Sequence, residues 1–252
     1  MTNIAICGAN GKMGRVIADI IANRDNCSVV AGIDKITDKY GDFEIFPSPA
    51  EMNVKPDVII DFSHPSTLDG LLEYCLSNGV PLVIATTGYS EEQIAKIRKA
   101  SESIPVFFTF NMSLGINLLA ELAKKAVSVL EGQFDIEIIE KHHNQKIDAP
   151  SGTAIMLAET INNTLETKCG YVYDRHSVRA KRTKNEIGIH SVRGGTIVGE
   201  HEIIFAGCDE VISLKHEAHS KSVFAVGSVN AAVFLSKKEP GMYDMSDMLA
   251  EI

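Results

Sequence analysis

"NIAICGANGKMGRVIADIIANR", residues 3–24, is the stretch of sequence that decides the fold. Its first five residues form a short apolar run, which predicts a β-strand at residues 3–7. Apolar side chains then recur at the period of an α-helix, at Met13, Val16, Ile17, Ile20 and Ile21. The stretch therefore predicts a strand that passes through a glycine loop into a helix.

The same alternation continues through the first half of the chain. Short apolar runs typical of strands follow at residues 28–34, 57–62, 81–86 and 105–110, with helical patterns at 66–78 and 90–102. Because these runs are apolar throughout, they favour a parallel sheet covered by helices on both faces. We therefore expect an α/β fold with a Rossmann-like, doubly wound parallel sheet.

A different pattern begins after Asn111. It predicts a helix at 114–131, a strand at 134–140, a helix within 148–166, and three strands within 186–218 that are joined by glycine-containing turns. This run of hairpins predicts a second, α+β domain with an open mixed, mainly antiparallel sheet. Residues 166–185 predict a mobile loop. The small residues of the helix at 221–238 allow it to pack back on the first domain.

The charge and the cysteines of the chain exclude several classes of function. With 24 basic and 33 acidic residues the formal net charge is −9, which disfavours nucleic acid and anionic membranes as partners. No apolar run approaches the ~18 residues of a membrane span, and the N-terminus has no basic n-region, so we expect a cytoplasmic protein. The five scattered cysteines include no CxxC pair, which argues against a disulfide framework and a structural zinc site.

Three glycines lie between the first strand and the first helix. Gly8, Gly11 and Gly14 allow a tight turn and bring the backbone and the helix N-terminus close to a pyrophosphate. Asp34 ends the next strand, 20 residues after Gly14, where an acidic side chain accepts hydrogen bonds from the adenosine ribose. The loop therefore predicts dinucleotide binding.

The residues around Asp34 are ambiguous about which nucleotide is bound. The carboxylate favours a free 2′-hydroxyl, whereas Lys35, and Lys12 in the glycine loop, can accommodate a 2′-phosphate. Alternatively, both lysines are solvated surface residues. We expect that both NADH and NADPH are used.

Three further loops lie at the carboxyl ends of predicted strands, the edge at which ligands of open α/β sheets bind. They are "DFSHP" (61–65), "ATTGY" (85–89) and "FNMS" (110–113), and they are candidates for the nicotinamide half of the site. The alternative for 86–88 is a loop whose hydroxyl groups merely cap the following helix.

"EKHHNQKIDAPSGTA", residues 140–154, is a basic cluster in an acidic protein. The pattern argues against a metal site, since adjacent His142 and His143 point to opposite sides of an extended chain and "HEAH" (216–219) has the wrong spacing for a zinc motif. We expect Lys141 to be a solvated surface residue.

An anion site explains this cluster better. Ser151 is a predicted N-cap, and Gly152 and Thr153 fall in the first turn of a helix whose N–H groups can hold a carboxylate. Lys146 adds a full charge, and an imidazole can supply a proton near neutral pH. An ordinary capped helix is the alternative, but it leaves the density of His and Lys without a reason.

Residues 137–154, "EIIEKHHNQKIDAPSGTA", resemble the signature of the dihydrodipicolinate reductase family of the lysine/diaminopimelate pathway. The pattern E-x-x-E-x-H-x-x-x-K-x-D-x-P-S-G-T-A is met in full. The resemblance extends along the chain through "GANGKMG", "ATTG", "FNMSLGIN", "SVRGGTIVGEH" and "GMYDM". It implies a dinucleotide-binding domain of residues 1–112 and 222–252, a substrate-binding and tetramerisation domain of residues 113–221, and a homotetramer.

The resemblance also implies a reaction, namely reduction of a cyclic unsaturated imine that carries two carboxylates, with hydride from NADH or NADPH. His142 corresponds to the general acid and Lys146 to a second proton-handling residue, while His143, Ser151, Gly152 and Thr153 correspond to positions that hold the dicarboxylate substrate. The positions that match cofactor contacts are Gly8, Ala9, Asn10, Gly11, Lys12, Met13, Asp34, Lys35, Ala85, Thr86, Thr87, Phe110, Asn111, Met112 and Ser113.

This sequence departs from the family pattern at three places. Ala85 stands where many members have Gly, Asp34-Lys35 replaces the common Glu-Arg pair, and His64 stands where some members have Arg. Two alternatives to this family are another two-domain Rossmann reductase of an amino-acid pathway and a non-catalytic dinucleotide-binding sensor. A semialdehyde dehydrogenase would need an acylating cysteine near a histidine, and the pair His142 and Lys146 argues against a sensor.

Overall fold

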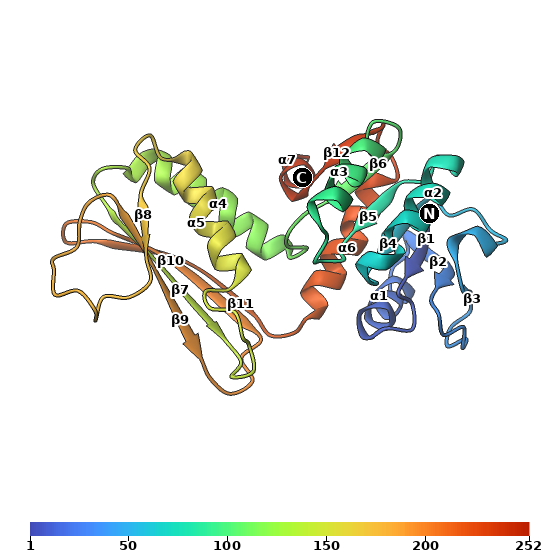
Figure 1. Cartoon of the computed structure of the whole chain (residues 1–252), viewed down its shortest axis with the longest axis horizontal. Coiled ribbons are helices and arrows are strands. Elements are labelled where there is room, and N and C mark those ends of the chain that lie inside the picture. Colours follow the sequence, from blue (N-terminus) through green and yellow to red (C-terminus); the bar gives the residue numbers. More distant parts are fainter. Residues whose placement is uncertain (252) are drawn as a thin grey trace. The chain divides into compact units, whose positions relative to one another are not determined.

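A computed structural model describes residues 1–251. The chain folds as two units, one of Met1–Leu114 with Ser222–Ile252 and one of Gly115–Lys221 (Figure 1). Each unit has its own sheet and its own apolar core.

The first unit is built on a seven-stranded parallel sheet with the order β12-β6-β5-β4-β1-β2-β3. The strand order reverses at β1, so the carboxyl ends of β1 and β4 lie side by side at the point where such sheets bind their ligands. The strands are β1 (Thr2–Cys7), β2 (Cys27–Ile33), β3 (Glu44–Phe46), β4 (Val58–Asp61), β5 (Leu82–Ile84), β6 (Pro105–Phe108) and β12 (Gly241–Tyr243). The predicted Rossmann-like sheet is confirmed.

Helices bury both faces of this sheet, which is why its strands are apolar at successive positions. Ile4 and Ile6 pack into one core, whereas Ala5 and Cys7 pack into the other. The helices are α1 (Lys12–Ala22), α2 (Leu68–Asn78), α3 (Glu91–Ala100), α6 (Ser222–Leu235) and α7 (Met245–Ala250), with short 3₁₀ turns η1 (Pro49–Glu51) and η2 (Pro65–Thr67).

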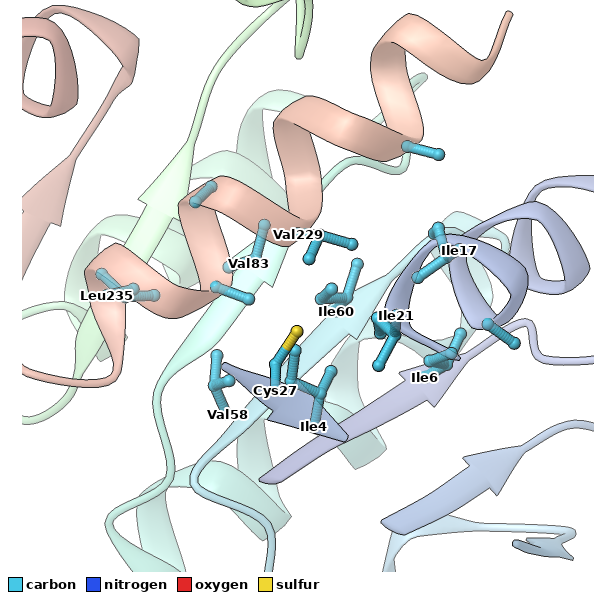
Figure 2. Close-up of a cluster of buried hydrophobic side chains, with 14 of the residues drawn as sticks. Ile4, Ile6, Ile17, Ile21, Cys27, Val58, Ile60, Val83, Val229 and Leu235 are labelled. Atoms are coloured by element: carbon cyan, nitrogen blue, oxygen red, sulfur yellow. The ribbon is translucent and has the colours of Figure 1, made fainter. Parts of the chain in front are cut away.

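The helix from the C-terminal part of the chain completes the first core. Figure 2 shows Val229 and Leu235 of α6 lying over the strands, in the same cluster as Val83, Ile60 and Ile17. Burial of each such side chain is worth roughly 1.5–3 kcal/mol. The expectation that this helix packs on the first domain is confirmed.

The second unit has a five-stranded sheet with the order β11-β10-β7-β9-β8. Its strands are β7 (Asp135–His142), β8 (Gly170–Val172), β9 (Glu186–Arg193), β10 (Gly199–Ala206) and β11 (Val211–Ala218). Two helices, α4 (Leu114–Leu130) and α5 (Gly152–Thr164), lie along one face of the sheet (Figure 1). Leu157 of α5 is buried there in one apolar core with Ile138 and Phe205 of the sheet.

The second sheet is mixed, as predicted. The β10–β11 and β10–β7 pairings are antiparallel, and the β7–β9 and β8–β9 pairings are parallel. The expected hairpin between β9 and β10 does not form, because β7 lies between these two strands. The turn residues between β9 and β10 carry no information about β7, which lies about 50 residues earlier in the chain.

Two local expectations also need correction. β7 continues to His142, two residues beyond the predicted strand, so that His142 faces Arg193 across the β7–β9 ladder. Residues 170–172, inside the predicted mobile loop, form β8 by pairing with β9. In both cases pairing with β9, and not the local sequence pattern, explains the additional strand residues.

Candidate active site

Each of the three glycines in the first loop has a different structural role. Gly8 has a positive φ of 83°, and a Cβ there would lie 2.5 Å from the Phe62 carbonyl oxygen. At Gly14, a Cβ would lie 2.7 Å from the Ala9 carbonyl oxygen, so glycine brings α1 close to the loop. Gly11 is exposed and is the N-cap of α1, with no side chain accepting from the first-turn N–H groups. These donors are therefore free of a side-chain cap, as a pyrophosphate site requires.

Asp34 ties the glycine loop to the chain after β2. Its Oδ2 accepts from Asn10 N at 2.9 Å, and its Oδ1 accepts from Ile36 N at 3.1 Å. The Asn10 side chain donates to the Ile36 carbonyl oxygen at 2.7 Å. Each carboxylate oxygen therefore retains an acceptor site at the end of the second strand.

Arg15 and Tyr40 also belong to this loop, and sequence reasoning missed both. Arg15 Nη2 donates to Asn10 Oδ1 at 2.7 Å, and its guanidinium lies 4.4 Å from the centre of the Tyr40 ring. The Tyr40 hydroxyl donates to the Ala9 carbonyl oxygen at 2.8 Å. The position of Arg15 directly after the third glycine was the only sequence signal. Among the other predicted residues, Lys12 and Lys35 are exposed, Ala9 is buried and Met13 packs partly into the core.

A buried carboxylate organises the loops after β4 and β5. Asp61 is fully buried, and its carboxylate accepts from the hydroxyl and the backbone N–H of Ser63 and from the Tyr89 hydroxyl, the last at 3.0 Å. Thr86 joins the network by accepting from Ser63 N at 2.9 Å. Burial raises the pKa of Asp61, and these hydrogen bonds oppose the rise.

The structure therefore links two of the three predicted nicotinamide loops. Thr86 is buried within the network, whereas Thr87 is exposed and Ala85 packs partly against the core. Asp61 lies in the predicted 61–65 loop but was not among the predicted site residues. Its signal was a charged side chain at the end of an otherwise apolar strand.

The third loop follows β6. Asn111, Met112 and Ser113 are buried, and Asn111 Oδ1 accepts from Ser113 N at 2.8 Å. Phe110 is instead 84% exposed. Its ring lies 6.2 Å from that of Phe108, which lies 6.4 Å from that of Tyr89. This row of aromatic rings connects the third loop with the second.

In the second unit, Glu140 is the centre of the cluster at the end of β7. Its side chain is fully buried, and each of its carboxylate oxygens accepts two hydrogen bonds. Oε2 accepts from His142 Nδ1 at 2.6 Å and Arg193 Nη1 at 2.8 Å, and Oε1 accepts from Arg193 Nη2 at 2.7 Å and Ser151 N at 3.1 Å. Burial alone would raise the pKa of Glu140, but hydrogen bonds led by those from Arg193 and His142 hold it at about 2.

Two histidines share this cluster. The side chain of His142 is 12% exposed, and burial lowers its pKa although the neighbouring Glu140 raises it. His201 is buried opposite Glu140 on β10, with its ring 5.2 Å from that of His142 in an edge-on arrangement. Burial lowers the pKa of His201 to about 4, with His142 as the next cause, so the ring is neutral at pH 7.

Ser151 connects the cluster to α5. Its hydroxyl oxygen accepts from Ala154 N at 3.1 Å, which confirms the predicted N-cap, and lies 3.0 Å from His201 Nε2. Ser151 is itself buried. Gly152 is exposed with open space around it, and Thr153 is half-buried in the first turn of α5. The start of the helix therefore presents Gly152 rather than Ser151 to its surroundings.

The remaining residues of the predicted cluster lie in the loop after β7. Lys146 Nζ forms an ion pair with Asp148 at 2.9 Å, and His143 is half-buried. Lys141, predicted to be a solvated surface residue, instead pairs with Glu200 at 2.8 Å because the two residues are neighbours across β7 and β10. Glu140, Arg193 and His201 were missed as functional candidates, although all three lie in segments quoted for the resemblance.

Within residues 1–251 no helix is both long and apolar enough to cross a membrane. The same residues contain no group of three or more His, Cys, Asp or Glu side chains arranged to hold a metal ion.

Comparison with known proteins identifies relatives of the whole chain. The family models "Dihydrodipicolinate reductase, N-terminus" and "Dihydrodipicolinate reductase, C-terminus" match residues 2–112 and 115–249. The chain is 49% identical to the 4-hydroxy-tetrahydrodipicolinate reductase of Clostridium tetani over 99% of its own length and 97% of that protein. It is 50% identical to the enzyme of the same name from Caldanaerobacter subterraneus over 99% and 98% of the two chains.

Solved structures agree with these relatives. A dipicolinate-bound dihydrodipicolinate reductase from Paenisporosarcina superposes with a TM-score of 0.81 at 27% identity, over 97% of both chains. A myo-inositol dehydrogenase from Corynebacterium glutamicum, with a TM-score of 0.62 at 17% identity over 99% of this chain and 93% of that one, shares the fold alone. The chain therefore belongs to the dihydrodipicolinate reductase family of oxidoreductases.

Proposed function

We propose that the chain is a 4-hydroxy-tetrahydrodipicolinate reductase of lysine and diaminopimelate biosynthesis. It would reduce dihydrodipicolinate, which forms from 4-hydroxy-tetrahydrodipicolinate, to tetrahydrodipicolinate with hydride from NADH or NADPH. The observation that carries this proposal is the cluster at the end of β7, where a buried carboxylate holds His142 beside the N-terminus of α5. The two alternatives, another Rossmann reductase of an amino-acid pathway and a nucleotide sensor, give this cluster no role.

The glycine loop fits a dinucleotide. Residues 8–13 would hold the pyrophosphate with their backbone and with the uncapped N-terminus of α1, and Asp34 would accept from a ribose hydroxyl. Thr86 and Thr87 with residues 110–113 would line the nicotinamide half. A bound nicotinamide nucleotide supplies the hydride. The exposed cations Lys12 and Lys35 support use of NADPH beside NADH.

The second unit offers the groups that a dicarboxylate needs. A structural relative has dipicolinate, a planar dicarboxylate, bound to it. In this chain Lys146 supplies a positive charge, and Gly152 and Thr153 lie at the N-terminus of α5, where backbone N–H groups favour an anion. His143 adds a polar contact from the adjoining loop.

His142 is the proposed proton donor. Hydride addition to the conjugated imine leaves an electron pair on the substrate, and a proton must reach this pair. Because Glu140 accepts from Nδ1 of His142, the proton available to the substrate is on Nε2. Lys146 would anchor a carboxylate and stabilise the negative charge that develops. After the transfer, neutral His142 would regain a proton from water.

The test is oxidation of NADH and of NADPH coupled to freshly made dihydrodipicolinate. The unmodified chain should oxidise the nucleotide only when the substrate is present. His142→Gln should lower kcat by about 10²–10⁴-fold, the range for a general acid, and should leave nucleotide affinity unchanged. His219→Gln, at an 87% exposed histidine, is the matched control. Nucleotide binding without turnover would support the sensor instead, and full turnover in His142→Gln would remove this residue from the mechanism.

The proposal extends to a cytoplasmic homotetramer. All five cysteines are unpaired, as is usual in a reducing compartment. Val192, Val211 and Ile212 leave apolar surface exposed on strands of the second sheet, as a subunit interface would require. Light scattering of the purified chain would measure its mass in solution, and a monomer would contradict this part of the proposal.

A further inference from the structure

Glu140 connects three elements around His142. Within one carboxylate it joins the end of β7 through His142, the end of β9 through Arg193, and the start of α5 through Ser151. A fully buried carboxylate is rare unless it is paired with a cation and fully hydrogen-bonded. Here both conditions are met, so Glu140 is ionised in the folded protein.

The carboxylate determines which nitrogen of His142 can give up a proton. An ionised carboxylate only accepts hydrogen bonds, so Nδ1 must carry a hydrogen at the 2.6 Å separation from Glu140 Oε2. Neutral His142 is then the Nδ1–H tautomer, and the protonated ring carries its second hydrogen on Nε2. When this hydrogen leaves, the ring returns to the Nδ1–H form without reorientation.

The space beside Nε2 is kept open by a glycine. A Cβ at Gly199, at the start of β10, would lie 3.1 Å from His142 Nε2 and 3.4 Å from its Cδ2. Any larger residue would press on the atom that delivers the proton. Glu140 holds one side of the ring, and Gly199 adds no side chain on the other side, so that the mostly buried ring keeps 12% of its side-chain surface exposed.

Charged and titratable groups face His142 from each neighbouring element. Glu140 of β7 is the anion, Arg193 of β9 and Lys146 of the following loop are cations, and His201 of β10 is neutral. Arg193 forms a bidentate pair with Glu140, which keeps the carboxylate ionised in its buried position. His142 therefore lies beside the fixed negative charge of Glu140, and Arg193 balances this charge.

We infer that Glu140 is a positioning residue for the reaction: it fixes the ring orientation and tautomer of His142 so that Nε2–H faces the substrate, and Arg193 keeps Glu140 charged. This inference rests on the proposed function. It assigns a role to a residue that touches His142 and need not touch the substrate.

Glu140→Gln is the decisive variant. The neutral amide has nearly the same shape but only one acceptor oxygen, so it cannot accept from both Ser151 N and His142 Nδ1, and it carries no charge. We expect kcat to fall by about 10²-fold, the lower end of what a general acid contributes. Removal of the anion also makes protonated His142 less stable. The high-pH limb of the kcat profile should therefore move to lower pH, since a donor must be protonated to act.

Glu200→Gln is the matched control, because Glu200 is a partly buried glutamate on β10 that pairs with Lys141 outside the cluster. It should leave kcat and the pH profile unchanged. Dipicolinate affinity, measured by calorimetry on the same variants, should change less than kcat does in Glu140→Gln. A role confined to holding the start of α5 would weaken dipicolinate binding and leave the pH limb in place.

Two further outcomes overturn the inference, and one concerns the proposed function. If Glu140→Gln matches Glu200→Gln in kcat and pH limb, Glu140 does not position the donor. If Glu140→Gln fails to fold, Glu140→Asp keeps the charge but shortens the side chain by one methylene, and wild-type kcat and pH limb in that folded variant also overturn it. If the unmodified chain turns over no substrate, the proposed function fails, independently of both variants.

Discussion

Gly14→Ala and Gly11→Ala test whether Gly14 is needed for the packing of α1 and Gly11 for nucleotide binding. At Gly14 the added methyl group would lie 2.7 Å from the Ala9 carbonyl oxygen, 2.8 Å from Ala9 Cα, and closer still to the Gly8 carbonyl oxygen. All three atoms belong to the backbone, so no side chain can rotate away. At Gly11 only the Gly8 carbonyl oxygen comes near, at 3.1 Å, and φ is an ordinary −69°.

The expected magnitudes follow from these distances. At Gly14 the methyl group would stand about 0.7 Å inside ordinary van der Waals contact with the Ala9 oxygen, so α1 must move away from β1. Overpacking of this kind costs ~1–3 kcal/mol, and the higher helix propensity of Ala returns at most ~1 kcal/mol. Because all three contacts are with backbone atoms, we expect the upper end of this cost and a net loss of about 2 kcal/mol in the free energy of unfolding, which would lower Tm by roughly 4–8 °C in a chain of this length.

Thermal unfolding followed by circular dichroism, with no nucleotide present, measures the first effect. Gly11→Ala should melt within about 2 °C of wild type, since exposed substitutions without backbone strain change stability by ~0.5 kcal/mol or less. It should instead weaken NADH and NADPH binding about tenfold, or ~1.4 kcal/mol, because its methyl group projects beside the uncapped N–H groups of α1. A wild-type Tm in Gly14→Ala, or wild-type nucleotide affinity in Gly11→Ala, would refute the steric argument.

Three further predictions concern single side chains. Lys146→Ala should raise KM and lower kcat together by about 10-fold each, because the charge is proposed to act both in binding and in the transition state; unchanged steady-state kinetics would place Lys146 outside the site. Asp34→Asn should raise the ratio of NADPH to NADH in kcat/KM by about 10-fold, since the carboxylate repels a 2′-phosphate; a fixed ratio would show that Asp34 does not face the ribose. Burial lowers the pKa of His201 to about 4, below the ~6.5 of the unfolded chain, so the unfolded state binds more protons between these values and stability is lost as pH falls through that window. His201→Gln should therefore show a smaller drop in Tm between about pH 7 and 4.5 than wild type does, and an equal drop would contradict the assignment.

Part of the fold follows from local pattern alone. A strand that is buried on both faces needs apolar residues at successive positions, so β1, β4, β5 and β6 were recognisable one at a time. β3 and β12 were not predicted, because each has only two apolar residues, whereas β5, of the same length, is apolar and buried throughout. They exist because a neighbouring parallel strand completes their hydrogen bonds.

The candidate site divides in the same way. The signature around His142 and Lys146, the N-cap at Ser151 and the glycine loop are local, because backbone conformation and helix capping depend on residues a few positions apart. The roles of these residues in binding and proton transfer stay predictions. Sequence alone therefore determined the family, the parallel sheet and a short list of chemical groups.

Only the tertiary structure decided how these groups are held. Insertion of β7 between β9 and β10 brings Arg193 and His201 to Glu140 from more than 50 residues away in the chain. In the first unit, the ends of β4 and β5 bring Thr86 and Tyr89 to Asp61. A buried carboxylate is stable only where its partners converge, and strand order rather than spacing along the sequence sets that convergence.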